Sequence, residues 1–284
     1  MSDRRLLADI GGSSSRWALM DGNEVQVLTD QGAWPGGNIT HGPPGELLDR
    51  LIGGVPEVNT VSELIAYGAG CGTPERAQLL GEALAAVMPH ARMSIRSDLL
   101  GVGRALHAHG SGAVLVLGTG MSAGWMKDGD LEWTLPSLGW VLGDEGSGAD
   151  IGRRLHRDAF RGRMPDPVRE HLFGAEGPDL GALLSSFQAT GKAAASLASP
   201  LVRAHAIRTH PYIEQVLQEH FEALSEILAA RFGRGGVMHA AGSIAWAFQV
   251  PLEQALSRKG LALGRVIRDP LPELMRFHWP KARA

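Results

Sequence analysis

The sequence predicts an α/β protein made of two similar lobes, each with a mixed β-sheet. Short apolar segments of strand length alternate with longer segments whose apolar residues recur at helical spacing. The 38 glycines among 284 residues gather in short clusters, which indicates tight backbone loops. A shift of 107 residues also places Gly11 on Gly118 and Asp21 on Asp128, so a strand, turn and strand pattern occurs twice.

The first lobe is expected to span residues 1–110. It opens with a β-meander, because an Asp21-Gly22 pair supplies the positive φ that a tight hairpin turn needs. Thr73 followed by proline is typical of a helix start. We expect strands at 6–10, 17–20, 25–28, 61–67 and 92–96, and helices at 46–52, 73–88 and 99–107.

The second lobe is expected to span residues 111–284 and to open in the same way. Its last helix is a candidate to pack back on the first lobe, and two such lobes would place a cleft between them. We expect strands at 113–117, 124–126, 131–134 and 236–240, helices at 147–160, 212–232, 244–259 and 270–277, and a loop rich in proline and glycine after residue 160.

The composition limits the classes of function. With 44% hydrophobic and 20% charged residues the chain can bury a real core, which excludes a disordered or collagen-like protein. No run approaches the roughly 20 apolar residues of a membrane span, and the first residues do not resemble a signal peptide. A net charge of -3 gives no electrostatic reason to bind nucleic acid or an anionic membrane. We therefore expect a soluble cytoplasmic protein that binds small molecules.

The first candidate motif runs from Asp9 to Arg16 and reads Asp-Ile-Gly-Gly-Ser-Ser-Ser-Arg. A strand that ends in an acidic residue and turns on two glycines exposes backbone N–H groups and hydroxyls to an anion, while Asp9 can hold Mg²⁺ through water. It is neither a Walker A loop nor a dinucleotide-binding loop. The simpler alternative is a glycine-rich turn with a buried aspartate. A second glycine loop, Gly118-Thr119-Gly120, stands at the equivalent place of the repeat and favours a pair of phosphate-binding loops.

Two further motifs carry acidic residues next to expected helix starts. Asp144 and Glu145 lie between glycines, where they can accept hydrogen bonds from ligand hydroxyls; alternatively they offset the helix dipole while Ser147 caps the helix. Ser97 and Asp98 follow the strand at 92–96. Asp98 can take a proton from a hydroxyl, but capping of the helix is the stronger interpretation of these two residues from the local pattern alone.

These motifs together resemble the N-acetylglucosamine kinase family, which is grouped with the BadF/BadG/BcrA/BcrD ATPases in the superfamily of actin, sugar kinases and Hsp70. The resemblance spans nearly the whole chain and implies two duplicated actin-like, ribonuclease H-like lobes with a cleft for ATP and sugar between them. Its most specific part is the Gly-Asp-Glu-Gly-Ser-Gly segment that starts at Gly143. The other parts are Asp9–Ser15, Tyr67–Cys71, Ser97–Gly101, Leu117–Gly120, Gly162–Pro165, Ala241–Ala245 and Gly260–Gly264.

The resemblance implies an ATP-dependent and Mg²⁺-dependent kinase that phosphorylates a hydroxyl of an amino sugar, and a homodimer. Asp98 would be the catalytic base, which reverses the preference for capping, and Asp9 would face Mg²⁺ through water. The residues implied to bind ATP are Gly11, Gly12, Ser13, Ser15, Gly118, Thr119, Gly120, Gly242 and Ser243. Those implied to contact the sugar are Asn38, Asp98, Ser122, Gly139 and Asp144.

The chain departs from the family pattern at two places. The family usually reads Gly-Thr-Gly-Ser-Asn at the second loop, whereas Met121 and Ser122 follow Gly120 here. The first loop has serines where threonines and often a lysine stand. One alternative is therefore a nucleotide-binding ATPase or regulator of the BadF type without kinase activity. An activator that holds an iron-sulfur cluster between subunits needs more cysteines than Cys71 alone.

A group of arginines between residues 153 and 163 offers a further alternative, a nucleic-acid site. The chain has no general excess of positive charge to support that function. The group, made of Arg153, Arg154, Arg157, Arg161 and Arg163, is better interpreted as a solvated or intersubunit face.

Overall fold

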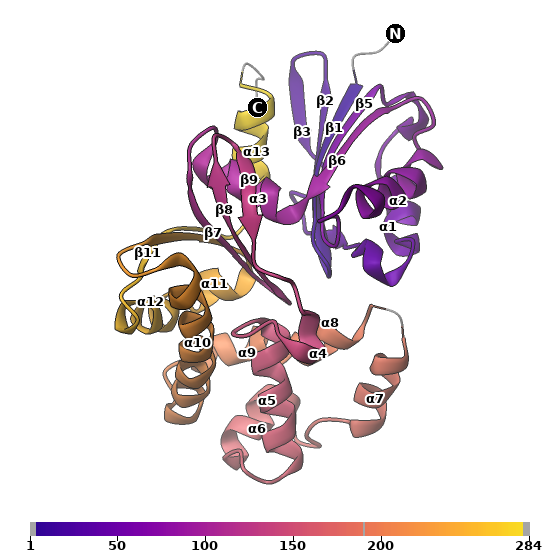
Figure 1. Ribbon diagram of the computed structural model, residues 1–284. Coiled ribbons are helices and arrows are strands. Elements are labelled where there is room, and N and C mark those ends of the chain that lie inside the picture. The colour runs from indigo at the N-terminus through magenta and orange to yellow at the C-terminus, as the bar shows by residue number, and fades with distance from the viewer. Residues whose placement is uncertain (1–3, 190, 281–284) are drawn as a thin grey trace. The chain divides into compact units, whose positions relative to one another are not determined.

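The computed structural model describes residues 4–189 and 191–280 and confirms the α/β fold (Figure 1). The chain divides into two compact units. Unit 1 contains the residues up to Ser111, the segment Met126–Leu131 and the residues from Asp269 on. Unit 2 contains Gly112–Trp125 and Glu132–Arg268. Among the residues described, no helix is both long and apolar enough to cross a membrane.

The sheet of unit 1 has the strand order β3-β2-β1-β5-β6, with β4 added on β2. Strands β1, β5 and β6 run parallel to one another, and β2 pairs antiparallel with β1. The sheet is therefore mixed, as the sequence predicts. Its strands are β1 (Arg4–Ile10), β2 (Ser14–Asp21), β3 (Glu24–Val27), β4 (Trp34–Pro35), β5 (Glu63–Gly68) and β6 (Arg92–Ser97).

Successive side chains of β1 point to opposite faces of this sheet. Leu6, Ala8 and Ile10 are fully buried in a core shared with the first two α-helices. Leu7 and Asp9 belong to the opposite face, which the third and the last α-helix cover (Figure 1). The helices of this unit are η1 (Ile39–His41), α1 (Gly45–Gly54), η2 (Val58–Thr60), α2 (Pro74–Ala85), α3 (Asp98–His107) and α13 (Leu271–His278).

The second sheet repeats the topology of the first. Its order is β11-β10-β7-β8-β9, with β7, β10 and β11 parallel. In this order the five strands correspond to β6, β5, β1, β2 and β3 of the first sheet. The repeated strand pattern of the sequence therefore corresponds to a repeated sheet. Its strands are β7 (Gly112–Leu117), β8 (Met121–Lys127), β9 (Asp130–Thr134), β10 (Val237–Ala241) and β11 (Ala262–Ile267).

Three local predictions in this part of the chain were wrong or incomplete. The segment after residue 160 is a series of short helices and not a loop, strand β11 was not predicted, and the helix expected at 244–259 is two helices that meet at Phe248. The helices are α4 (Gly139–Leu142), α5 (Gly148–Phe160), α6 (Asp166–Phe173), α7 (Leu180–Gln188), α8 (Ala193–Ala198), α9 (Leu201–Ala204), η3 (His205–Ile207), α10 (Pro211–Phe232), α11 (Ser243–Ala247) and α12 (Gln249–Arg258).

Candidate active site

The carboxyl ends of the parallel strands of unit 1 lead into the motifs singled out from the sequence. Strand β1 ends at Ile10 before the first glycine loop, and β6 ends at Ser97 before Asp98. The carboxyl ends of parallel strands lie at one edge of a sheet, where α/β proteins place their ligands. The electrostatic influence of Asp98 on Asp9 agrees with this placement.

Asp98 is the first residue of helix α3. The cap of that helix is Ser97, whose hydroxyl accepts the backbone N–H of Leu100 at 3.3 Å. Asp98 Oδ1 accepts the N–H of Leu99 at 2.9 Å. Burial raises the pKa of Asp98 to about 6, although the hydrogen bonds from backbone N–H groups oppose that rise. A carboxylate with a pKa near 6 is suited to accept a proton close to neutral pH.

Asp9 lies on β1 in a surplus of negative charge. Its pKa is raised to about 8, mainly by burial and also by the nearby Asp98 and Asp269, while Arg16 opposes the rise. Arg16 also forms an ion pair with Asp269, with Nε and Oδ2 3.6 Å apart. Asp269 precedes α13 and accepts the N–H of Leu271 at 2.9 Å. Asp9 thus lies near two further carboxylates and one guanidinium, but among the residues that the structure describes no three histidine, cysteine, aspartate or glutamate side chains are grouped closely enough to hold a metal ion directly.

Replacement of Asp9 by asparagine is expected to stabilise the protein in the absence of nucleotide and Mg²⁺. The pKa of Asp9 is raised from 3.8 to about 8, so the folded state binds a proton that the unfolded state has lost between these values. The free energy of unfolding of the natural protein therefore falls as the pH rises through this window. Melting temperatures at pH 5 and pH 8 should show a larger gain for the variant at pH 8. An equal gain at both values would contradict this account.

The first glycine loop is held in shape by the segment that follows β3. The N–H of Gly11 donates to the carbonyl of Ser14 at 2.9 Å, and the N–H of Gly37 donates to the carbonyl of Gly11 at 3.0 Å. A Cβ added at Gly36 would lie 2.5 Å from the Gly11 carbonyl oxygen, so only glycine permits this approach. Gly12 and Ser13 are exposed at the tip of the loop.

Ser15 points inward from the same loop. It is 1% exposed, donates its hydroxyl hydrogen to the Pro35 carbonyl at 2.7 Å and accepts Trp17 Nε1–H at 2.8 Å. This hydroxyl therefore fixes the loop to its neighbours. Asn38 caps η1: its Oδ1 accepts the N–H and the hydroxyl of Thr40 at 3.0 and 2.7 Å. Its side chain also lies against Gly70, which follows strand β5.

The second glycine loop sits on the start of helix α5. The N–H of Gly118 donates to the Gly120 carbonyl at 3.0 Å and closes the turn. The N–H groups of Gly148 and Ala149 donate to the carbonyls of Gly118 and Thr119 at 2.8 and 3.0 Å. The first turn of α5 thus fixes the direction of this loop.

Gly242 and Ser243 meet the same loop from the end of strand β10. Gly242 has a φ of +115°, and a Cβ added there would lie 2.5 Å from the Leu117 carbonyl oxygen. Ser243 is exposed and begins helix α11. The structure therefore brings together all five residues of unit 2 that the resemblance implies in ATP binding.

Asp144 joins the second glycine loop to the Gly-Asp-Glu-Gly-Ser-Gly segment. It is 8% exposed with a φ of +58°, and a Cβ added at Gly120 would lie 2.9 Å from its Oδ2. Burial raises the pKa of Asp144, a hydrogen bond from the Met121 backbone lowers it, and Glu145 and Asp150 raise it. Ser147 caps α5 by accepting the N–H of Asp150 at 3.3 Å.

Two other residues implied in sugar contact lie in unit 2. Gly139 begins helix α4 with a φ of +68°, and this helix leads directly into Gly143 and Asp144. Ser122 is half-buried on strand β8, two residues after Gly120. Both residues are therefore close in sequence to the segments that carry Asp144 and the second glycine loop.

Comparison with solved structures identifies the fold. A protein from Porphyromonas gingivalis, provisionally named an N-acetylglucosamine kinase, matches with a TM-score of 0.82 at 26% identity, over 96% of this chain and 98% of that chain. A provisionally named N-acetylglucosamine kinase from Chromobacterium violaceum matches with a TM-score of 0.68 at 18% identity, over 97% and 98%. The chain has the fold of the actin-like sugar kinases. The resemblance to N-acetylglucosamine kinases is thereby confirmed.

A more distant match supports the same fold. The glucokinase of the ROK family from Streptomyces griseus, solved with glucose and AMPPNP, matches with a TM-score of 0.53 at 12% identity, over 93% of each chain. At such identities the likeness concerns the fold alone. No family model matches the sequence, and no curated protein sequence does so.

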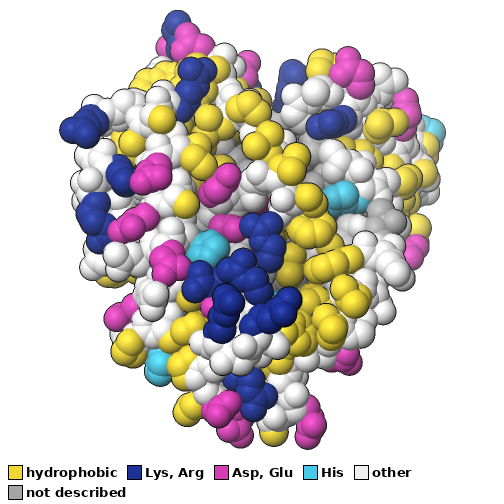
Figure 2. All heavy atoms as spheres, turned by 60° about the horizontal axis from the view of Figure 1, so that its bottom comes forward, with side chains coloured by type: hydrophobic (Ala, Val, Ile, Leu, Met, Phe, Trp, Pro, Cys, Tyr) yellow, Lys and Arg dark blue, Asp and Glu magenta, His cyan; other side chains and the backbone are white. Residues whose placement is uncertain are grey.

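The arginines of α5 lie among acidic partners. The face of α5 and α6 comes forward in Figure 2, where Lys and Arg side chains gather beside a strip of hydrophobic side chains. Arg153 pairs with Asp150, and Arg154 pairs with both Asp158 and Glu219. Because these guanidiniums already contact carboxylates within unit 2, the geometry supports a structural role for this part of the group.

Proposed function

We propose that this protein is an ATP-dependent kinase that phosphorylates a hydroxyl of an amino sugar such as N-acetylglucosamine. The observation that carries the proposal is Asp98, a carboxylate at the edge of the sheet whose pKa of about 6 suits a base. Support comes from the match to the Porphyromonas gingivalis protein, which carries the name of an N-acetylglucosamine kinase. The glucose and AMPPNP held by the Streptomyces griseus glucokinase are ligands of the same chemical classes.

In unit 1 we assign the proton transfer to Asp98. Its carboxylate accepts the proton of the sugar hydroxyl, the hydroxyl oxygen bonds to the γ-phosphorus of ATP, and the bond from that phosphorus to the bridging oxygen breaks, which releases ADP. We assign the exposed backbone of Gly12 and the Ser13 hydroxyl to the phosphate oxygens, with the half-buried Gly11 beside them. Asn38 is assigned to the sugar.

In unit 2 we assign Gly118, Thr119 and Gly120 to the phosphates and Gly242 with Ser243 to the adenosine. Asp144, Gly139 and Ser122 are assigned to the sugar, because the 139–144 segment and the second glycine loop converge on Asp144. A buried carboxylate accepts hydrogen bonds from sugar hydroxyls strongly where water is excluded.

Asp9 would face Mg²⁺ through water, as the resemblance implies, and the nearby carboxylates of Asp98 and Asp269 make its surroundings negative, which favours a cation there. When bound, Mg²⁺ neutralises charge on the phosphate oxygens during transfer. We further propose a homodimer, as the resemblance to N-acetylglucosamine kinases implies. We also propose that the protein acts in the cytoplasm, as expected from its sequence.

The proposal is tested by ADP release from ATP and Mg²⁺ in the presence of single sugars. N-acetylglucosamine, glucosamine, N-acetylmuramic acid and glucose are compared with a reaction that lacks sugar. We expect release that depends on an amino sugar. Release that is slow and equal in every reaction would favour the second candidate, a nucleotide-binding ATPase or regulator of the BadF type. That candidate is suggested by Met121 and Ser122, which replace the usual residues after Gly120.

The rate is expected to depend on pH through Asp98. Because the base must be ionised and its pKa is raised to about 6, kcat/KM for the sugar should fall about tenfold per pH unit below pH 6. An aspartate of ordinary pKa would retain its activity to about pH 4. The measurement is a pH profile at saturating ATP and Mg²⁺, over a range in which the protein stays folded. A flat profile down to pH 5 would contradict the assignment.

A further inference from the structure

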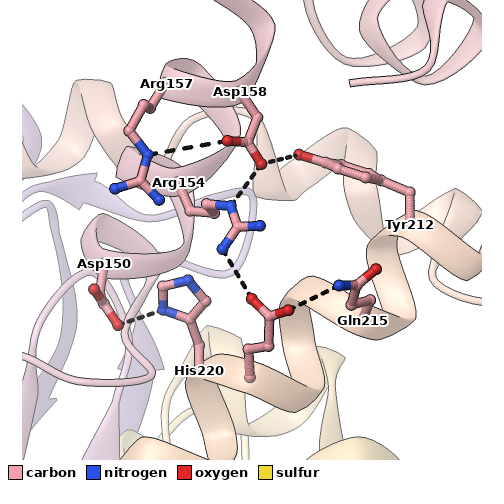
Figure 3. Close-up of polar contacts among 8 residues, drawn as sticks. Asp150, Arg154, Arg157, Asp158, Tyr212, Gln215 and His220 are labelled. Carbon is pink, nitrogen blue, oxygen red and sulfur yellow. Dashed lines mark hydrogen bonds and ion pairs between the residues drawn. The ribbon is translucent and has the colours of Figure 1, made fainter. Parts of the chain in front are cut away.

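Asp150 is a buried carboxylate whose two oxygens bind three different groups. The residue is 7% exposed in the first turn of α5. Its Oδ2 accepts Nδ1–H of His220 at 2.6 Å and the backbone N–H of Gly146 at 3.0 Å. Its Oδ1 accepts Nη2–H of Arg153 at 2.8 Å. Figure 3 shows His220 reaching from the neighbouring helix, α10, toward Asp150.

These contacts keep Asp150 ionised although it is buried. Burial alone raises the pKa of Asp150, but the hydrogen bond and charge of His220, the Gly146 N–H and Arg153 lower it, and the net pKa lies below the ordinary value. An ionised carboxylate is the stronger hydrogen-bond acceptor. Asp150 is therefore a fixed anchor for the groups that donate to it.

The groups that donate to Asp150 contact both ends of the segment that carries Asp144. Gly146 is bound at one end, and the N–H of Ser147 donates to the Asp144 carbonyl at 3.0 Å. At the other end, Nη1–H of Arg153 donates to the Trp140 carbonyl at 3.0 Å. Residues 140–146 are thus tied at both ends to one carboxylate, directly or through Arg153.

Close packing leaves this segment little room to shift. Gly146 has a φ of +72°, and a Cβ added there would lie 2.9 Å from Leu224 Cδ2 on α10. The anchoring side chain of His220 comes from the preceding turn of the same helix. Helix α10 therefore contacts both the backbone of this segment, at Gly146, and the carboxylate of Asp150.

We propose that Asp150, held by His220 and Arg153, positions residues 140–146 so that Asp144 meets the sugar, and thereby sets the affinity for the sugar. This role rests on the proposed kinase function. Asp150, His220 and Arg153 are positioning residues, because they act through the backbone of this segment.

A neighbouring network offers a matched control. About two helical turns along α5 from Asp150, Asp158 accepts the Tyr212 hydroxyl at 3.0 Å and Nε–H of Arg154 at 2.5 Å (Figure 3). This network joins the same two helices, α5 and α10, and does not contact residues 140–146. Tyr212→Phe therefore removes a contact between the helices without removing an anchor of the segment.

The kinetic experiment compares His220→Leu, His220→Asn and Tyr212→Phe with the natural protein. The asparagine amide stands where Nδ1 stands and can donate to Asp150, whereas leucine cannot. We expect His220→Leu to raise KM for the sugar about tenfold, which corresponds to about 1.4 kcal/mol, with KM for ATP changed less than about twofold. His220→Asn should recover most of this loss, and Tyr212→Phe should resemble the natural protein. Equal effects on both KM values, or an equal effect of Tyr212→Phe, would overturn the proposal.

Arg153→Ala provides a second variant in case His220→Leu does not fold. The Arg153 side chain is 45% exposed, so its removal leaves the core intact, and it should also raise KM for the sugar. An unchanged KM for the sugar in this variant would overturn the proposal.

Hydrogen exchange separates this proposal from the kinase function, since it needs no turnover. Backbone amides of residues 140–147 should exchange faster in His220→Leu than in the natural protein, and at the natural rate in Tyr212→Phe. Unchanged exchange in His220→Leu would overturn the positioning role. If exchange responds as expected while no sugar stimulates ADP release, the kinase function fails and the anchoring of the segment stands.

Discussion

Replacing Asp98 by asparagine is expected to lower the rate of sugar phosphorylation by roughly 10²–10⁴-fold, the contribution of a general base. The asparagine keeps the size of the side chain and an oxygen that can accept the Leu99 N–H, as Asp98 Oδ1 does at 2.9 Å. The fold should therefore survive. The measurement is kcat with the best sugar at pH 7.5, together with a binding measurement for ATP, which should change little.

Ser97→Ala is the matched control for this variant. Ser97 caps helix α3 one residue earlier, so its loss should cost about 1 kcal/mol of stability while kcat stays close to the natural value. Comparison of the two variants distinguishes the loss of a helix cap from the loss of a catalytic base. A similar kcat for Asp98→Asn and the natural protein, or an equal loss in Ser97→Ala, would show that Asp98 does not take the proton.

Replacing Gly152 by alanine is expected to destabilise unit 2 strongly. Gly152 lies inside helix α5, and a Cβ added there would overlap the carbonyl oxygen of Leu197 on α8. The obstructing atom belongs to the backbone, so the two helices must separate. Overpacking of this kind costs about 3 kcal/mol, which lowers Tm by roughly 6–12 °C. Thermal unfolding followed by circular dichroism measures the loss.

Gly81→Ala is the control, because Gly81 also lies inside a helix, α2. A Cβ added there would lie 3.6 Å from Ile95 Cγ1, an ordinary contact. Alanine should be neutral or stabilise by up to about 1 kcal/mol, as expected for a helix interior. Equal stability of Gly152→Ala and Gly81→Ala would contradict the close approach of α5 to α8 at Gly152.

Local sequence patterns predicted the glycine loops and the strands other than β4 and β11. The Asp21-Gly22 turn and the strand before Gly118 lie where the alternation of apolar residues places them, and the shift of 107 residues corresponds to two sheets of the same strand order. Asp98 was harder to interpret, because a serine and an aspartate at a helix start both suit a cap. In the structure the N–H of Leu100 donates to the Ser97 hydroxyl, so Ser97 is the cap of helix α3.

Residues that depend on distant contacts were missed. Asp269 meets Arg16 and influences Asp9 although about 250 residues separate them in the chain, and no local pattern predicts such a pair. His220 lies on the long helix α10 and belongs to no sequence motif. Only its hydrogen bond to Asp150 indicates a role. The short helices after residue 160 were missed for a related reason. Helix α7, for example, leaves Leu180 and Leu184 exposed, so it lacks a clear buried face.

We propose that Asp98 is the base for phosphoryl transfer from ATP to a sugar. The most direct test follows ATP, Mg²⁺ and N-acetylglucosamine by phosphorus NMR in the presence of the protein. We predict a sugar phosphomonoester that forms in equal amount to ADP and is absent with Asp98→Asn. Inorganic phosphate formed at the same rate with and without the sugar, and no phosphomonoester from any amino sugar, would contradict the account.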